Sequence, residues 1–421
     1  MDVAKRALAR RLAALAAASP PSMICVCVCV GVTLAGDAGC TSDDPAPRAI
    51  GGVDGGGATP DAAAPADAGA DGATPTGDAG DAGALTLHVY PRTGSAVDDP
   101  GAPNGPGMVL MGGGADIGDA FVWAHDTIAG SPTRTAGDVV VLRASGDDAY
   151  DPYIHGLAPF NSVRTILLAQ TPTPADYAAA AAIVAEAEMV WFAGGDQAKY
   201  VRWKGSPLMK AVAGVYARGG VVGGTSAGAM IQGAFTFDAL NAISESVTSA
   251  VALADPFDPK ISLTKHVVDY GPASAGLGDA LVDVHFAQRG RFGRTTTFLA
   301  RAISDGMVDR APARALGVAL DEGVALLVDK TRTARVVRGS GTTTDAAHFL
   351  RATPATRVAA KQPLLLGGVV VTRLDDPSQS FDLERWCGTG PTFTVDVDGG
   401  AAPPYTPGSP YGAPGPLGTC P

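Results

Sequence analysis

The stretch "VVGGTSAGAMIQG", Val221 to Gly233, joins an apolar pair, two glycines, a hydroxyl residue and a run of small residues. Ser226 is the central residue of its G-x-S-x-G pattern at positions 224–228. We interpret the stretch as a buried strand, a tight turn and the start of a helix, because small flanking residues permit a strained turn that exposes the serine hydroxyl above a sheet. Five residues are a weak signal in a chain this rich in Gly and Ala, so the rest of the sequence must decide.

Apolar runs alternate with helical patterns around this stretch. Four further runs are typical of buried strands: "GMVLMGGG", "DVVVLRASG", "SVRTILLAQ" and "AEMVWFAGG". Two helices are expected to start at Thr173-Pro174 and at Ser206-Pro207, each a capping residue followed by proline. The alternation predicts an α/β fold of three layers, with a mostly parallel sheet flanked by helices and Ser226 at the carboxyl end of a strand. Apolar segments after Asp279 are expected to finish the same sheet.

The first 40 residues are typical of an export signal. Four basic residues within positions 5–11 precede the short apolar run "MICVCVCVGVTLAG", which is too brief to span a bilayer comfortably. Ala38-Gly39 before Cys40 resembles a lipoprotein cleavage site, which would place a lipid on Cys40 and anchor the chain to a membrane, although Asp37 departs from the usual apolar residue. Plain secretion, or an uncleaved anchor, is the alternative.

Composition divides the remainder of the chain. Residues 41–84 are almost entirely Ala, Gly, Asp, Pro and Thr, which predicts a disordered tether. Residues 85–376 are expected to form the folded domain and residues 377–421 a C-terminal tail, in which the stretch "GGAAPPYTPGSPYGAPGPLG" before Cys420 is loop-like. The formal net charge of −11, without a basic block beyond the start, gives no electrostatic support for nucleic-acid binding. Cys387 and Cys420 are expected to pair as a disulfide, because export favours oxidation and no metal-binding spacing accompanies them.

A serine nucleophile requires a base, and the base requires an acid to orient it. Among the six histidines, His285 in "DVHFAQRGRFGR" has the most distinctive surroundings, with Asp283 before it and three arginines after it. His266 is a less certain case, and the others are expected at the surface.

Three blocks resemble the cyanophycinases and related aspartyl dipeptidases, serine peptidases with a class I glutamine-amidotransferase-like (flavodoxin-like) fold. They are "FAGGDQ" at 192–197, "GGTSAGA" at 223–229 and "DVHFAQRGRFGR" at 283–294, with "ALDEGVALLVD" at 319–329 as weaker support. The resemblance covers about half of the chain, roughly 108–327. Val284 departs from the glutamine usual in the family, which puts a substrate contact in doubt.

The resemblance implies Ser226 as nucleophile and His285 as general base, in agreement with the chemistry of the residues themselves. The family pattern places a Glu after the nucleophile helix, and Glu245 is the only Glu between Ser226 and His285. The acid stays open, because several aspartates compete with it: Asp238, Asp255 and Asp283.

The loops suggest further roles. The N–H groups of Ala227 and Gly195 are natural oxyanion donors, since glycine lets the backbone approach and a helix start carries positive potential. Gln197 could position substrate, and Asp283 is also expected among the substrate-binding residues. Arg289 and Arg291 would suit an aspartate-rich substrate, because guanidinium binds carboxylate bidentately.

These inferences predict an exported serine hydrolase that cleaves β-aspartyl linkages of cyanophycin to β-aspartyl-arginine dipeptides, without metal or organic cofactor. An exported α-aspartyl or other isopeptidase is the enzyme alternative, and an inactive surface-tethered binding protein is the alternative of another class. The resemblance also implies a homodimer, although no interface is identified.

Overall fold

The computed structural model describes residues 87–99, 101–168, 171–242, 246–271, 275–308, 313–339 and 345–420. All of them belong to one compact unit, Pro60–Pro421. The export signal at 1–40 with Cys40, the tether at 41–84 and Glu245 lie outside the described residues. Within the described part of the chain, no helix is long and apolar enough to cross a membrane.

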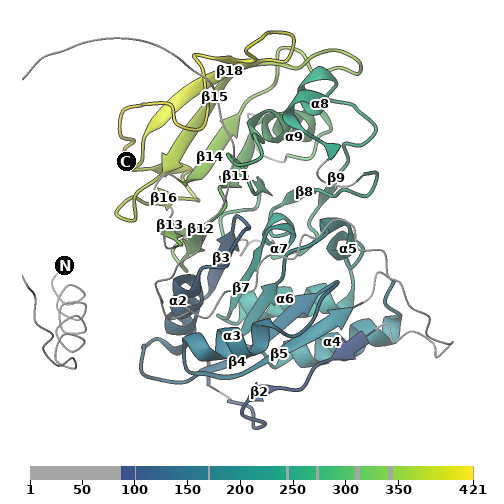
Figure 1. The fold of residues 1–421 in the computed structure, drawn as a ribbon, viewed down its shortest axis with the longest axis vertical. Helices are drawn as coiled ribbons and strands as arrows, with labels where there is room; N and C mark the ends of the chain where they lie inside the picture. Colours follow the sequence, from purple (N-terminus) through teal and green to yellow (C-terminus); the bar gives the residue numbers. More distant parts are fainter. Residues whose placement is uncertain are drawn as a thin grey trace, which may run out of the picture. The chain divides into compact units, whose positions relative to one another are not determined.

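The first sheet contains the predicted parallel strands at its centre (Figure 1). Its order is β1-β5-β4-β6-β7-β3-β12-β13-β16-β17, with β2 paired to β5. The strands are β1 (Leu87–Val89), β2 (Thr93–Gly94), β3 (Gly107–Met111), β4 (Ala136–Arg143), β5 (Phe160–Leu168), β6 (Met189–Phe192), β7 (Val221–Thr225), β12 (Val324–Val328), β13 (Thr333–Arg338), β16 (Phe381–Asp382) and β17 (Cys387–Gly388). Strands β5, β4, β6, β7 and β3 pair in parallel, and the sheet is extended on both sides by antiparallel strands.

Helices cover both faces of this sheet because its central strands are apolar on both sides. On β4, Val140 and Leu142 pack in the core shared with α4 (Pro174–Ala185) and α6 (Pro207–Ala217), whereas Val139 and Val141 pack in the core shared with α2 (Gly118–Ala129) and α3 (Tyr150–Leu157). The predicted helix starts are confirmed: Thr173 forms a capping box with Asp176, and the Ser206 side chain accepts from the Met209 N–H.

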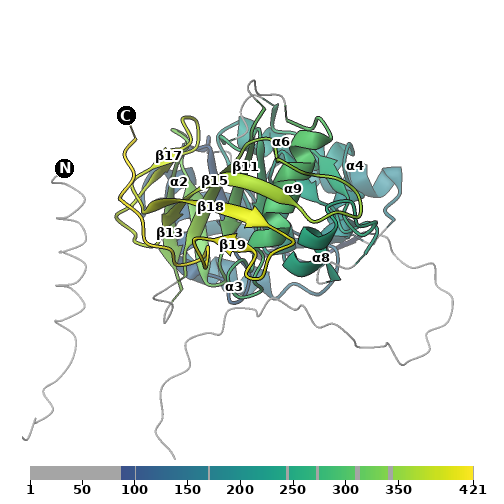
Figure 2. The ribbon, with the colours of Figure 1, turned by 90° about the horizontal axis from the view of Figure 1, so that it is seen from above.

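A second sheet, which the sequence did not predict, follows in the order β19-β18-β15-β14-β11-β10-β8-β9. Its strands are β8 (Phe235–Phe237), β9 (Leu263–Lys265), β10 (Ala280–Asp283), β11 (Ala315–Leu320), β14 (Ala347–Ala352), β15 (Leu365–Leu374), β18 (Thr392–Asp398) and β19 (Tyr405–Thr406). Helix α9 (Phe292–Ser304) packs against β11 and β14 and also contacts α8 (Ser249–Ala254) (Figure 2). Most pairings in this sheet are antiparallel, so the fold is α/β with mixed sheets. Of the segments after Asp279, β12 joins the first sheet as expected, whereas β10, β11 and β15 belong to this second sheet.

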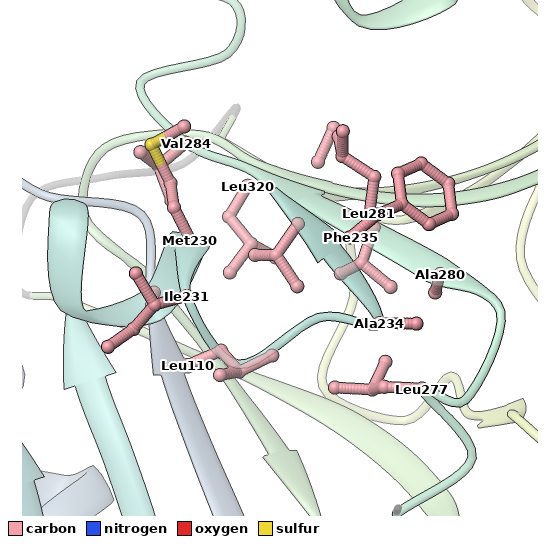
Figure 3. Packing of buried hydrophobic residues seen from close by; sticks show 14 of the residues in the cluster. Leu110, Met230, Ile231, Ala234, Phe235, Leu277, Ala280, Leu281, Val284 and Leu320 are labelled. Carbon is pink, nitrogen blue, oxygen red and sulfur yellow. The ribbon is translucent and has the colours of Figure 1, made fainter. Parts of the chain in front are cut away.

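The two sheets share a core close to the end of β7. Leu110 of the first sheet belongs to the same buried cluster as Leu281 and Leu320 of the second, and Met230 and Ile231, after the turn, lie in that cluster too (Figure 3). This shared packing brings the ends of β3, β7, β10 and β11 into one neighbourhood.

The C-terminal segment is more ordered than the expected tail. Strand β18 pairs with β15 over Thr392 to Asp398, and β17 pairs with β16. The predicted disulfide is present, with Cys387 and Cys420 Cα atoms 5.2 Å apart. Residues 381–398 thus add strands to both sheets, whereas the stretch from 399 to Cys420 is mostly loop, as expected, apart from the short strand β19.

Candidate active site

Ser226 lies on a sharp turn between β7 and the short helix α7 (Ala227–Met230). Its φ of 50° and ψ of −119° are strained for a residue with a side chain, and its N–H donates to the Met111 carbonyl at 3.1 Å. Gly228 is required here: a Cβ at that position would lie 2.2 Å from the Phe192 carbonyl oxygen. Small residues therefore let the turn pack directly on β6, as the G-x-S-x-G pattern predicted.

The structure brings His285 to Ser226. His285 follows β10, and its Nε2 lies 2.9 Å from Ser226 Oγ. Its backbone is also strained, with φ at 49°, and its N–H donates to the Gly112 carbonyl at 2.9 Å. A Cβ at Gly113 would lie 2.1 Å from His285 Cε1, so the glycines after β3 leave room for the imidazole ring.

Glu322 occupies the position of the acid. Its Oε1 lies 2.5 Å from His285 Nδ1, on the side of the ring opposite Ser226. Glu322 belongs to the short turn between β11 of the second sheet and β12 of the first. Glu245, the residue favoured from the sequence, lies outside the described residues, and the hydrogen bond to Nδ1 makes Glu322 a candidate for the acid.

Hydrogen bonds between backbone N–H groups and side-chain oxygens hold the Glu322 turn in place. The Glu322 N–H donates to Gln288 Oε1 at 3.0 Å. The neighbouring Asp321 accepts from the N–H groups of Ala287 and Ala346, each at 2.9 Å. These contacts tie the segment after His285 to the turn that carries Glu322, and they orient the acid relative to the imidazole.

The surroundings of His285 favour its neutral form. Burial lowers its pKa to about 4, and the positive charges of Arg291 and Arg289 act in the same direction, against the opposing effect of Glu322. A neutral imidazole at neutral pH can accept the proton of Ser226, which is what a general base requires.

The expected oxyanion donors lie at the same edge of the first sheet. Ala227 is the first residue of α7, so its N–H is among those that have no acceptor within the helix. Gly195 has a φ of 128° in the loop after β6, and β6 pairs in parallel with β7 through Phe192 and Gly224. The two loops therefore follow neighbouring strands at one edge of the sheet, and the donor role of both N–H groups stays a prediction.

Three residues expected to contact substrate have internal partners instead. Gln197 is 2% exposed and donates from Nε2 to the Phe237 carbonyl at 3.4 Å. Asp283 is completely buried and accepts from Arg294 Nε at 3.0 Å, while Arg291 Nη1 donates to the Val284 carbonyl at 2.9 Å. The contacts of Asp283 and Arg291 lie at the strand end that carries His285, and the substrate-binding role expected of all three residues stays a prediction.

Arg289 differs from the other two arginines of its block. Its side chain is 40% exposed, and its Nε lies 3.9 Å from Glu322 Oε1. Its guanidinium is thus beside the acid and in contact with solvent, where a substrate carboxylate could reach it. Arg294, in contrast, is 1% exposed and paired with Asp283.

Comparisons with known proteins find only remote structural matches. No family model matches the chain, and no curated protein matches it. A peptidase from an acI-B1 Actinobacterium aligns with a TM-score of 0.39 and 13% identity over 61% of this chain and 98% of the other. A structure from Listeria monocytogenes EGD-e titled a "Putative Peptidase E Protein" aligns with a TM-score of 0.33 and 11% identity over 56% of this chain and 100% of the other. At these scores the likeness carries no argument about activity, so the function is inferred from the site itself.

Proposed function

We propose that this chain is a serine hydrolase that works by acyl transfer through Ser226. The observation that carries the proposal is the continuous relay from Ser226 Oγ through the imidazole of His285 to Glu322. A serine, a histidine and a carboxylate that are hydrogen-bonded in this order, with the serine and histidine buried and the serine on a strained turn, form the arrangement that activates a hydroxyl as a nucleophile.

The atoms suggest the following sequence. Ser226 Oγ attacks the substrate carbonyl carbon while its proton passes to His285 Nε2, and Glu322 stabilises the imidazolium that forms. Nε2 then protonates the leaving amine, which departs and leaves an acyl-enzyme ester. Water attacks that ester and gives its proton to Nε2; the ester bond then breaks, Nε2 returns the proton to Ser226 Oγ, and the acid product leaves. The N–H groups of Ala227 and Gly195 would stabilise the oxyanion of both tetrahedral intermediates.

The substrate class that we favour is the β-aspartyl linkage, as in cyanophycin, an aspartate polymer carrying arginine. Two features support it: the three sequence blocks that resemble the cyanophycinases, and the half-exposed Arg289 beside Glu322, which is suited to a carboxylate next to the scissile bond. An α-aspartyl or other isopeptidase of the same mechanism is the second candidate.

Two assays on the full-length chain separate these functions. A fluorophosphonate probe should label the wild type and spare Ser226→Ala; a wild type that resists labelling would favour the inactive binding protein. Incubation with insoluble cyanophycin should release soluble β-aspartyl-arginine, and cleavage of α-aspartyl dipeptides alone would shift the assignment to the second candidate.

We also propose that the chain is exported, from the basic start, short apolar run and Cys40 of its sequence. Cell fractionation should find it in the medium or at the cell surface, and incorporation of a palmitate analogue should require Cys40. A full-length, unprocessed cytoplasmic form would contradict export.

A further inference from the structure

A cavity lies on the second sheet, beside the disulfide, and we name it the C-terminal cavity. Its volume is about 370 Å³, which is within the ordinary range for small-molecule sites of roughly 300 to 1,000 Å³. It is lined by side chains of β14, β15 and β18 on one side and by the segments around the disulfide on the other; these include Phe349, Arg351, Thr372, Trp386, Thr392 and Leu417.

Strand register explains why these side chains share the cavity. Phe349 and Arg351 are two positions apart on β14, so their side chains point to the same face. They lie opposite Thr372 and Val370 of β15, respectively. Thr372 in turn lies opposite Thr392 of β18. Directly paired residues point to the same face of a sheet, so all five belong to one surface.

The catalytic side chains lie toward the other face of β14. His348, which precedes Phe349, has its ring 5.0 Å from that of Phe286, the residue after His285. Leu350 packs near Gly317 and Leu299 of α9. Since successive strand residues point to opposite faces, the C-terminal cavity is separated from Ser226 and His285 by the sheet itself.

The cavity combines one cation with aromatic surface. Among the described residues, the partly buried guanidinium of Arg351 has no carboxylate within ion-pair distance, in a chain whose formal net charge is −11. Phe349 stacks on Phe381, with ring centroids 3.8 Å apart, and Trp386 packs edge-on against Phe381. A guanidinium donates hydrogen bonds and accepts none, so it selects an acceptor-rich group such as a carboxylate, while the aromatic rings favour a flat apolar body.

The far wall of the cavity is fastened to the sheet. The Gly418 N–H donates to the Gly390 carbonyl and the Thr392 N–H to the Pro416 carbonyl, both at 2.9 Å, and the Cys387–Cys420 disulfide closes the same segment. A wall held by covalent and backbone bonds is preorganised, which lowers the entropic cost of ligand binding.

We propose that the C-terminal cavity binds a small aromatic carboxylate, with its carboxylate on Arg351 and its ring against Phe349 and Trp386. The site is independent of hydrolysis at Ser226, and nothing in the acyl-transfer mechanism uses its residues.

Calorimetric titration of the full-length protein with phenylacetate tests the proposal, with phenylacetamide as the uncharged analogue of the same shape. We expect phenylacetate to bind with a Kd of about 1 mM or below, and phenylacetamide to bind at least about tenfold more weakly, as for loss of a charge-assisted hydrogen bond. Arg351→Gln should lower the affinity for phenylacetate to the same extent. Arg335→Gln, which removes an exposed arginine of β13, should leave that affinity unchanged.

Three results would overturn the proposal: no heat of binding up to about 10 mM phenylacetate, ten times the expected dissociation constant; equal affinity for the acid and the amide; or wild-type affinity in Arg351→Gln. Arg351 is a partly exposed strand residue outside the candidate active site. The hydrolytic activity of its variants can therefore be used to check that they fold. Arg351→Lys, which keeps the charge, should retain more affinity than Arg351→Gln.

Discussion

The two sheets contribute to the candidate active site in different ways. The first sheet presents Ser226 on a turn whose geometry comes from neighbouring small residues, so the local sequence is nearly sufficient to identify it. The second sheet presents His285 after β10, and Glu322 lies in the turn where the chain passes from β11 of the second sheet to β12 of the first. The comparison teaches that the nucleophile is encoded locally, whereas its base and acid depend on how two sheets pack together.

The largest effect is expected at the centre of the relay. Ser226→Ala and His285→Ala should each lower kcat by about 10⁴- to 10⁶-fold, and the double variant should be little worse, because members of such a relay act as a unit. The measurement is the steady-state rate on whichever substrate the cyanophycin and α-aspartyl dipeptide assays identify. Ser131→Ala, at an outer turn, is the matched control, and wild-type activity in Ser226→Ala would refute the mechanism.

The second prediction concerns the acid. Glu322→Gln should lower kcat by about 10³- to 10⁴-fold while preserving the fold, because a neutral amide no longer stabilises the imidazolium. Glu245→Gln should cost much less, since His285 Nδ1 is already bonded to Glu322. Parallel rate measurements decide between them, and a larger loss in Glu245→Gln would restore the sequence-based choice.

The third prediction tests whether Asp283, in the second sheet, stabilises the fold or binds substrate. Asp283→Asn should destabilise the protein by about 3 to 5 kcal/mol, because it leaves the Arg294 guanidinium buried beside a neutral amide. Urea unfolding measures the loss, and Asp269→Asn at an exposed site should change the midpoint little. Full stability combined with a raised KM in Asp283→Asn would instead return Asp283 to substrate binding.

The smallest effect is expected at Arg289. Arg289→Gln should lower kcat/KM by about tenfold, as for one charge-assisted hydrogen bond to substrate, without loss of stability. Arg335→Gln is the matched control. An unchanged kcat/KM would remove Arg289 from the substrate contacts.

The pH profile of kcat/KM tests whether the pKa of His285 is lowered. Burial and the nearby arginines lower the pKa of His285 from the ordinary value of 6.5 to about 4. As the pH is lowered, kcat/KM should therefore stay constant through pH 6.5 and fall only near pH 4, where His285 becomes protonated. Removing the Arg289 charge should raise the pKa, so the acid limb of Arg289→Gln should move to higher pH. An acid limb near 6.5 in the wild type would contradict the effect of burial.

The sequence by itself determined the features that depend on neighbouring residues. The turn at Ser226, the helix starts at Thr173 and Ser206 and the parallel strands around β7 follow from local sterics, capping and apolar periodicity. The pairing of Cys387 with Cys420 followed from there being only two cysteines after the export segment.

The candidate acid, the second sheet and the different burial of the three arginines depend on tertiary packing. Glu322 lies 96 positions after Ser226 in a turn with no catalytic pattern of its own, and it reaches His285 because β11 and β12 belong to different sheets. Arg289, Arg291 and Arg294 are equally charged and closely spaced, yet one is half-exposed and two are buried. Spacing along the chain could not separate them, because burial depends on which strands and helices pack around each side chain, and those contacts join residues far apart in sequence.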